Sequence, residues 1–261
     1  MATTLQKGEL FAPETVKDLF NKVRGKSSIA KLCGATPVAF NGNEIFTFSM
    51  DDEVNIVAEG TKKDAGSISV EPIKVVPIKI EYGARVTDEF VYASEEKQLD
   101  ILKAFNEGYA KKVARGLDIM AFHGVNPRTK TASALIGTNS LDTNTGVSSI
   151  PYSAVDIEAN RESAIAASSE NYDVTGMAMS KDFSSTLASL TVNGVKQYPE
   201  LAWGSNPGAV NGLAVDVNST VSFNSSKDKA IVGDFQNAFK WGFAKAVSYT
   251  HLRAHETGRN L

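Results

Sequence analysis

The spacing of hydrophobic and polar residues changes along this chain, and each change marks a different element. Between Glu44 and Met50, apolar and polar residues alternate, which is the period of a β-strand with two unlike faces. Alternation returns in three further stretches, at residues 54–58, 68–70 and 76–82. Pro72 and Pro77 interrupt the later stretches, and proline cannot donate a hydrogen bond to a β-ladder. We therefore expect a long hairpin over residues 44–83 that pairs at an edge or projects from the rest of the chain.

The tip of this hairpin, residues 61–67, is polar and charged and has almost nothing apolar to bury. Two-stranded ribbons are marginally stable in water when they stand alone. The hairpin is therefore expected to lie on a neighbouring subunit.

A helical period follows the hairpin. Ser94 is suited to cap a helix, Glu95 and Glu96 suit its first turn, and Gly124 suits its end. One apolar stripe runs along this segment: Leu99, Leu102, Phe105, Tyr109, Val113, Leu117 and Met120. A helix of about 30 residues would be roughly 45 Å long. A shorter amphipathic helix is expected at residues 14–24, behind a loose N-terminal arm.

The second half of the chain mixes both periods. Helices are expected at residues 153–168 and 181–190. Strands are expected at residues 134–137, 174–179, 213–217, 230–232 and 239–243. This mixture predicts an α+β lobe.

Composition narrows the possible functions. With 261 residues and 42% hydrophobic residues, the chain can bury a core in one large domain or two lobes. A formal net charge of −3 gives no basic surface for sequence-independent nucleic-acid binding. Neither a signal peptide nor a membrane-spanning apolar run is found, so we expect a cytosolic, soluble product. The single cysteine, Cys33, excludes an internal disulfide and is expected to be a buried side chain.

We find no pattern that predicts catalysis, a cofactor or a metal. The glycines form no phosphate-binding loop, and no serine nucleophile elbow occurs. His251 and His255 have the four-residue spacing of helical metal ligands, but no third ligand accompanies them. Isolated acidic residues such as Asp118 and Asp216 are interpreted as surface or packing-related charges. Both tryptophans, Trp203 and Trp241, are interpreted as packing residues.

The order of these elements, together with local motifs, resembles the major capsid proteins of tailed phages, which have the Hong Kong 97 fold. The motifs are Val-Ala-Glu-Gly at residues 57–60, residues 117–127 at the end of the long helix, and residues 179–182, 231–235 and 238–243. The resemblance covers residues 1–246. It implies an N-terminal arm at 1–35, an extended loop hairpin with flanking strands at 36–92, the spine helix of the peripheral domain at 93–131, and an axial domain at 132–246.

This resemblance implies a structural protein and no enzyme. Copies of the chain would form hexamers and pentamers of an icosahedral head that encloses phage DNA, assembled in the host cytoplasm and located in the virion. A scaffolding protein on a separate chain, a portal and a maturation protease would be partners, whereas membranes, cofactors and sequence-specific nucleic acid would not.

Four residues near the hairpin tip are candidates for contacts between subunits: Glu59, Lys62, Lys63 and Asp64. Some capsids of this fold join a lysine of this loop to an asparagine of another subunit through an isopeptide bond. The simpler interpretation of Lys62 and Lys63 is two solvated charges.

Residues 247–257 depart from the family and resemble a translated sequencing adapter. We therefore expect 247–261 to be a foreign tail and the C-terminal part of the peripheral domain to be missing. Two other functions remain open. An encapsulin-like compartment would use the same fold to enclose protein cargo, and an enzyme would need convergent polar groups in a deep pocket.

Overall fold

The computed structural model describes residues 21–50, 52, 54–62, 65–83, 95–167, 173–224 and 228–244. The chain forms two compact units. The hairpin unit spans Thr36–Lys79 and Gly242–Ala246, and the body unit contains the rest. Predictions for residues 1–20, for Ser94 and for the 247–261 tail lie outside the described residues.

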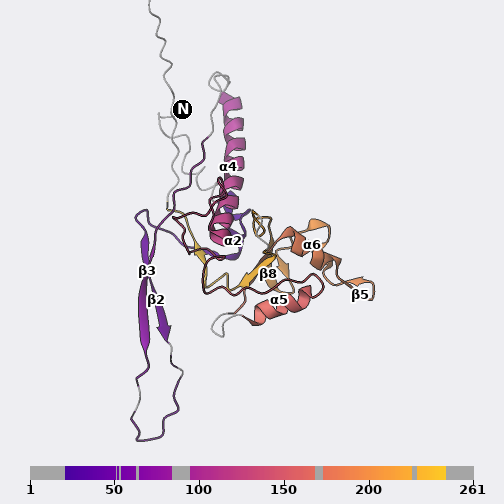
Figure 1. The fold of residues 1–261 in the computed structure, drawn as a ribbon. Helices are drawn as coiled ribbons and strands as arrows, with labels where there is room; N and C mark the ends of the chain where they lie inside the picture. The colour runs from indigo at the N-terminus through magenta and orange to yellow at the C-terminus, as the bar shows by residue number, and fades with distance from the viewer. Residues whose placement is uncertain are drawn as a thin grey trace, which may run out of the picture. The chain divides into compact units, whose positions relative to one another are not determined.

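The hairpin unit is a two-stranded antiparallel ribbon (Figure 1). Strand β2, Asn43–Met50, pairs with β3, Ile68–Val75, and Phe48 lies opposite Val70. The predicted hairpin is confirmed over these strands but is shorter than expected, because residues 54–58 and 76–83 form no regular strand. Pro77 cannot donate a ladder hydrogen bond, which is consistent with pairing that ends at Val75.

The long helix of the body unit is α4, Glu95–His123, as predicted. It ends at Gly124, whose backbone takes a positive φ of 64° that suits glycine. A Cβ atom at this position would lie 2.7 Å from the Ser140 Oγ atom, so the close approach also requires glycine. The most buried side of the helix carries small residues and residues near its end: Ala110, Val113, Ala114, Ile119 and Phe122.

The other part of the body unit is built on a mixed four-stranded sheet with the strand order β7-β8-β4-β9. These strands are β4 Gly176–Met179, β7 Ala209–Val210, β8 Leu213–Val217 and β9 Ala230–Gly233. Strand β4 runs parallel to β8 and antiparallel to β9. The predicted α+β class is confirmed at this level.

Strand β4 is buried along its whole length, which shows that both faces of the sheet are covered there. On one face, Met177 and Val215 belong to a core shared with α5, Ile157–Ala166, and α6, Lys181–Ser189 (Figure 1). On the other face, a Cβ atom at Gly176 would lie 3.5 Å from Leu32 in the short helix α2, Ser28–Leu32.

Short elements complete the body unit. Strand β1, Gly34–Ala35, pairs in parallel with β10, Lys240–Trp241. Strands β5, Thr191–Val192, and β6, Val195–Lys196, form a small hairpin. It is followed by the 3₁₀ segment η1, Pro199–Gly204.

The two tryptophans differ. Trp241 is buried, and its Nε1–H donates a hydrogen bond to the Cys33 carbonyl, which confirms its packing role. Trp203 is fully exposed and has a positive φ of 62°, so the packing interpretation was wrong there. It lies at the kink of η1, where Ala202 and Trp203 have non-helical backbone angles.

Three further sequence predictions need correction. Residues 134–137 form a turn, because the backbone N–H groups of Ile136 and Gly137 both bond to the Ser133 carbonyl. The helix expected from Ser153 begins at Ile157, after Asp156. The strand expected over residues 239–243 is limited to Lys240–Trp241.

In the described part of the chain, no helix combines the length and apolarity that crossing a membrane requires.

Candidate interaction surface and buried polar sites

The two faces of the hairpin differ in chemistry. Because side chains alternate along a strand, the cross-strand pairs Phe46–Pro72, Phe48–Val70 and Met50–Ile68 share one face. We call these six residues the apolar face. The opposite face includes the pairs Ile45–Ile73 and Thr47–Glu71.

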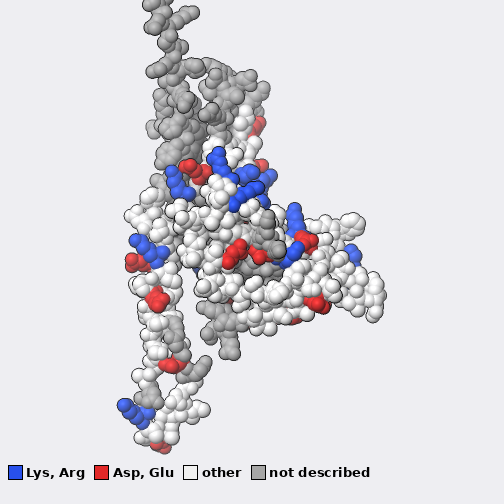
Figure 2. All heavy atoms as spheres, viewed as in Figure 1, with Lys and Arg blue, Asp and Glu red and all other residues white. Residues whose placement is uncertain are grey.

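The apolar face is exposed within the hairpin unit. Phe46, Phe48 and Met50 are 65%, 62% and 70% exposed, respectively. In Figure 2, uncharged side chains make up most of the visible surface of this ribbon. Contiguous exposed apolar surface marks sites of protein association in soluble proteins. The arrangement is therefore suited to contact with another protein surface.

The hairpin tip is organised by Asp52. Its Oδ2 atom accepts hydrogen bonds from the Ser67 backbone nitrogen at 2.6 Å and the Ser67 hydroxyl at 3.0 Å. These bonds lower the pKa of Asp52 below its ordinary value, the backbone bond contributing most. The predicted contact residues Glu59 and Lys62 are both exposed near this tip. Lys63 and Asp64 lie outside the described residues.

A buried carboxylate joins α4 to the start of α2. Asp118 is completely buried, and its two oxygens accept five hydrogen bonds. The donors are the Ser27 hydroxyl, the backbone nitrogens of Ser28 and Ile29, the Asn218 amide and the Thr220 hydroxyl. Burial raises the pKa of Asp118, and the hydrogen bonds from residues 27–29 and 220 oppose that rise.

A second buried carboxylate, Asp216 of β8, contacts the same segment. It accepts hydrogen bonds from the Ser28 hydroxyl at 2.5 Å, the Lys31 ammonium at 2.6 Å and the Asn206 amide at 2.8 Å. Consecutive serines thus bond to two different buried aspartates. The interpretation of Asp118 and Asp216 as surface charges was wrong, and the packing-related interpretation holds.

The sequence contained a weak signal for this network. Asp118 lies between Leu117 and Ile119, near the buried end of a long helix, where an unpaired charge would be costly. Its partners come from positions about 90 residues earlier and 100 residues later, so no local pattern could identify them. Among the described residues, every buried side-chain nitrogen and oxygen has a hydrogen-bond partner.

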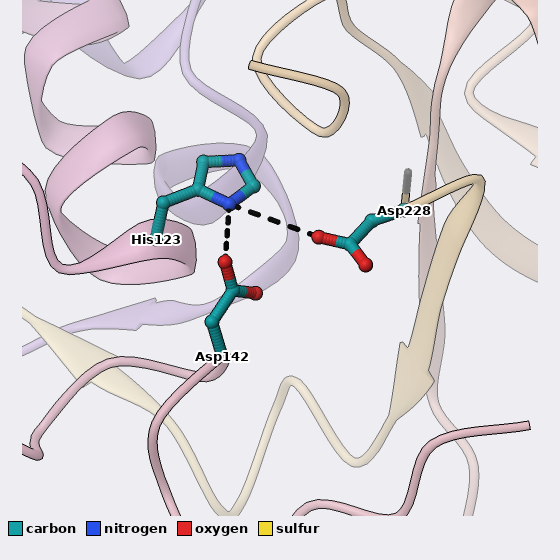
Figure 3. A group of neighbouring side chains, drawn as sticks. All are labelled: His123, Asp142 and Asp228. Atoms are coloured by element: carbon teal, nitrogen blue, oxygen red, sulfur yellow. Dashed lines mark hydrogen bonds and ion pairs between the residues drawn. The ribbon is translucent and has the colours of Figure 1, made fainter. Parts of the chain in front are cut away.

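A third polar group lies at the C-terminal end of α4 and was not predicted. His123 Nδ1 lies 2.7 Å from Asp142 Oδ2 and 3.8 Å from Asp228 Oδ2, as Figure 3 shows. Its other ring nitrogen, Nε2, lies 2.8 Å from the Thr220 carbonyl oxygen. Burial lowers the pKa of His123, but the hydrogen bonds to Asp142 and Thr220 and the charges of both aspartates outweigh it and raise the pKa overall.

A hollow of about 220 Å³ lies between α6 and η1. Its lining residues include Ser184, Ser185 and Trp203, and Lys181 is the one titratable side chain among them. A single ammonium group supplies no acid–base pair. The residues that line this hollow therefore do not form the acid–base arrangement that would support the enzyme hypothesis.

Comparison with known proteins gives matches among solved structures. A chain from Mycobacterium phage Ogopogo matches with a TM-score of 0.68 and 25% identity over 94% of this chain and 82% of that one. A chain from Gordonia phage Cozz matches with a TM-score of 0.65 and 22% identity over 84% of this chain and 71% of that one. The capsid of a native gene transfer agent particle matches with a TM-score of 0.56 and 10% identity over 94% of this chain and 82% of that one. No protein-family model and no curated protein matches the chain.

Proposed function

We propose that this chain, which has the fold of tailed-phage major capsid proteins, assembles with copies of itself into the icosahedral head that encloses phage DNA. The observation that carries the proposal beyond the fold is the apolar face of the hairpin. Cross-strand contacts within the ribbon leave Phe46, Phe48 and Met50 between 62% and 70% exposed. Their burial against a neighbouring subunit would stabilise a shell.

The finer architecture is proposed by the same resemblance. Residues 36–92 would form the extended loop, α4 would be the spine helix within residues 93–131, and residues 132–246 would form the axial domain. Residues 1–35 would be the N-terminal arm. In this assignment, β2 and β3 would reach a neighbouring subunit, and the mixed sheet would belong to the axial domain.

The tip residues are proposed as secondary contacts between subunits. Glu59 and Lys62 are exposed and of opposite charge, so they could pair with complementary charges on a neighbour. Lys63 and Asp64 are proposed with them from the sequence alone. Rim charges of this kind affect the rate and specificity of association more than its free energy.

The proposed setting follows from a phage head. Shells would form in the host cytoplasm from hexamers and pentamers, with a portal, a maturation protease and a separate scaffolding protein as partners. The encapsulin-like alternative is not favoured, because the matching structures reported above come from phages and a gene transfer agent. The capsid fold also favours a structural role over an enzymatic one.

The tail is proposed to be foreign. Its sequence at 247–257 resembles an adapter, and two of the three histidines in the chain lie there. Resequencing the parent genome across the codon for Ala246 tests this directly. A natural reading frame that encodes His251 and His255 would refute the proposal.

Electron microscopy of two expressed chains tests the function. The first carries the sequence that naturally follows Ala246, and the second is the chain as it stands. Icosahedral particles from the first chain, alone or with its scaffolding protein, are expected. Soluble monomers from the first chain under both conditions would contradict shell assembly.

A further inference from the structure

The His123 cluster brings together three segments that are distant in sequence. His123 is the last residue of α4, Asp142 follows in the loop region after that helix, and Asp228 precedes β9. One oxygen from each aspartate and one ring nitrogen lie within 4.8 Å of one another. Figure 3 shows both carboxylates directed towards the same ring nitrogen.

The contact of the second ring nitrogen, Nε2, determines which nitrogen of neutral His123 carries the hydrogen and which carries the lone pair. Nε2 lies 2.8 Å from the Thr220 carbonyl oxygen, and a carbonyl can only accept a hydrogen bond. Nε2 therefore carries a hydrogen, and in neutral imidazole the lone pair lies on Nδ1. That lone pair faces the oxygens of two carboxylates. A positive charge between them, either a proton or a metal ion, would relieve the repulsion between this lone pair and the carboxylate oxygens.

The groups match those of a transition-metal site. A histidine ligand commonly donates its other ring N–H to a backbone carbonyl, which fixes the tautomer and orients the ring. Imidazole nitrogen with carboxylate oxygen suits Zn²⁺ and similar divalent ions better than Mg²⁺ or Ca²⁺, which prefer oxygen alone. Two carboxylates also neutralise the ionic charge.

The spacing is close to what such an ion needs. Two ligands at about 2.0–2.1 Å from a tetrahedral ion lie roughly 3.3 Å apart. The observed Nδ1 to oxygen distances, 2.7 Å to Asp142 and 3.8 Å to Asp228, lie on either side of that value. The Asp142 and Asp228 side chains are 35% and 42% exposed, so small rotations and access from solvent are both feasible.

We propose that His123 Nδ1, Asp142 and Asp228 bind a divalent transition-metal ion of the Zn²⁺ class, with water completing its coordination. A bound ion would connect the end of α4 to the loops around residues 142 and 228. This site is independent of the proposed assembly, so failure of one does not decide the other.

Zn²⁺ binding to the full chain tests the proposal. The starting variant carries His251→Gln and His255→Gln, because the two tail histidines could bind Zn²⁺ themselves. After treatment with EDTA, calorimetric titration at pH 7.5 is expected to show saturable binding of one Zn²⁺ per chain. Thermal unfolding should shift upwards with Zn²⁺ and not with Mg²⁺. Co²⁺ should give the visible absorption of a nitrogen- and oxygen-ligated site.

Three further variants locate the site. Asp228→Asn removes a half-exposed ligand and should abolish the saturable heat while the chain remains folded. Asp142→Asn should do the same. Asp156→Asn, at an exposed aspartate before α5, is the matched control and should leave Zn²⁺ binding unchanged.

Two outcomes would overturn the inference. One is Zn²⁺ binding that persists undiminished in Asp228→Asn. The other is equal unfolding temperatures for the EDTA-treated and Zn²⁺-loaded chains, which would mean that a proton rather than a metal occupies the space at Nδ1.

Discussion

The Asp118 carboxylate in α4 accepts a hydrogen bond of 3.0 Å from the backbone nitrogen of Ser28, ninety residues earlier in the chain. The same carboxylate accepts hydrogen bonds from the Ser27 hydroxyl and the Ile29 backbone nitrogen, so it binds the residues where α2 begins. Ser27 also caps α2 by accepting a hydrogen bond from the Ala30 nitrogen. One side chain therefore fixes the start of one helix against the end of another.

Replacing this carboxylate should destabilise the body unit strongly. In Asp118→Asn, an amide NH₂ would face donors that now bond to oxygen, leaving buried N–H groups unpaired. The expected loss in the free energy of unfolding is about 3 kcal/mol. Urea denaturation followed by circular dichroism measures it. Asp100→Asn, at an exposed position of α4, is the control, and equal stability of the two variants would contradict the role of Asp118.

A charge on the apolar face should prevent assembly and leave the subunit folded. Phe48→Lys places an ammonium where we expect burial against a neighbour, whereas Ser69→Lys places the same charge on the opposite face of the hairpin. In the chain with its natural C-terminal sequence, electron microscopy should show particles for Ser69→Lys and few or none for Phe48→Lys. Full assembly of Phe48→Lys would show that this face is not a contact.

The single thiol should be unreactive in the folded protein. Burial raises the pKa of Cys33 to about 12, with the Asp118 charge adding to the rise and Lys240 opposing it. At pH 8, the reactive thiolate is therefore almost absent. Labelling with iodoacetamide should be slow in buffer and rapid in urea, as mass spectrometry can measure. Rapid labelling without urea would mean that the β1–β10 region opens readily.

Acid should release the hairpin tip. The folded-state pKa of Asp52 lies below its unfolded value, so its contribution to tip order is fully present above the unfolded pKa and is lost as pH falls through the folded pKa. An NMR titration should place the Asp52 midpoint below about 3.9, the ordinary aspartate value. The Ser67 amide signal should shift with the same midpoint. Independent midpoints for the two residues would contradict the bond between them.

The strained conformation of Trp203 should be relieved by glycine. Its exposed ring adds no packing within the described structure, and its φ of 62° is unfavourable for a side chain with a Cβ atom. Trp203→Gly is therefore expected to leave stability unchanged or raise it by up to about 1 kcal/mol. Trp241→Ala, which removes a buried ring, should cost about 3 kcal/mol. Thermal denaturation compares the two, and a large loss in Trp203→Gly would refute the assignment of strain.

Local periodicity predicted the elements whose secondary structure depends mainly on nearby residues in the sequence. The α4 helix and the paired part of the hairpin follow from spacing, turn residues and a glycine stop. The stripe from Leu99 to Met120 predicted the helix but not its most buried positions, which include Ala110 and Ala114. Small residues are buried there because α4 approaches other segments closely, and this approach depends on tertiary packing rather than on period.

Polar sites were less predictable, because their members converge from distant positions. His123 appeared in the sequence only as the end of a helix, and Asp142 and Asp228 lie in loops without a motif. Similarly, the alternation from Val76 to Tyr82 resembled a strand, but no partner strand is present beside it in the described residues. Alternation shows that a segment could pair and does not identify the segment that pairs with it.

The parallel pairing of β1 with β10 affects how the protein is made. Strand β1 pairs with β10 through Gly34–Lys240 and Ala35–Trp241. It therefore cannot pair until β10 has been synthesised, about two hundred residues later. At roughly 5–20 residues per second, translation delays this pairing by at least about ten seconds. During that interval, the Cys33 carbonyl lacks the hydrogen bond that the Trp241 indole donates to it. The pairing of β1 with β10 is therefore among the last contacts of the body unit that can form during synthesis.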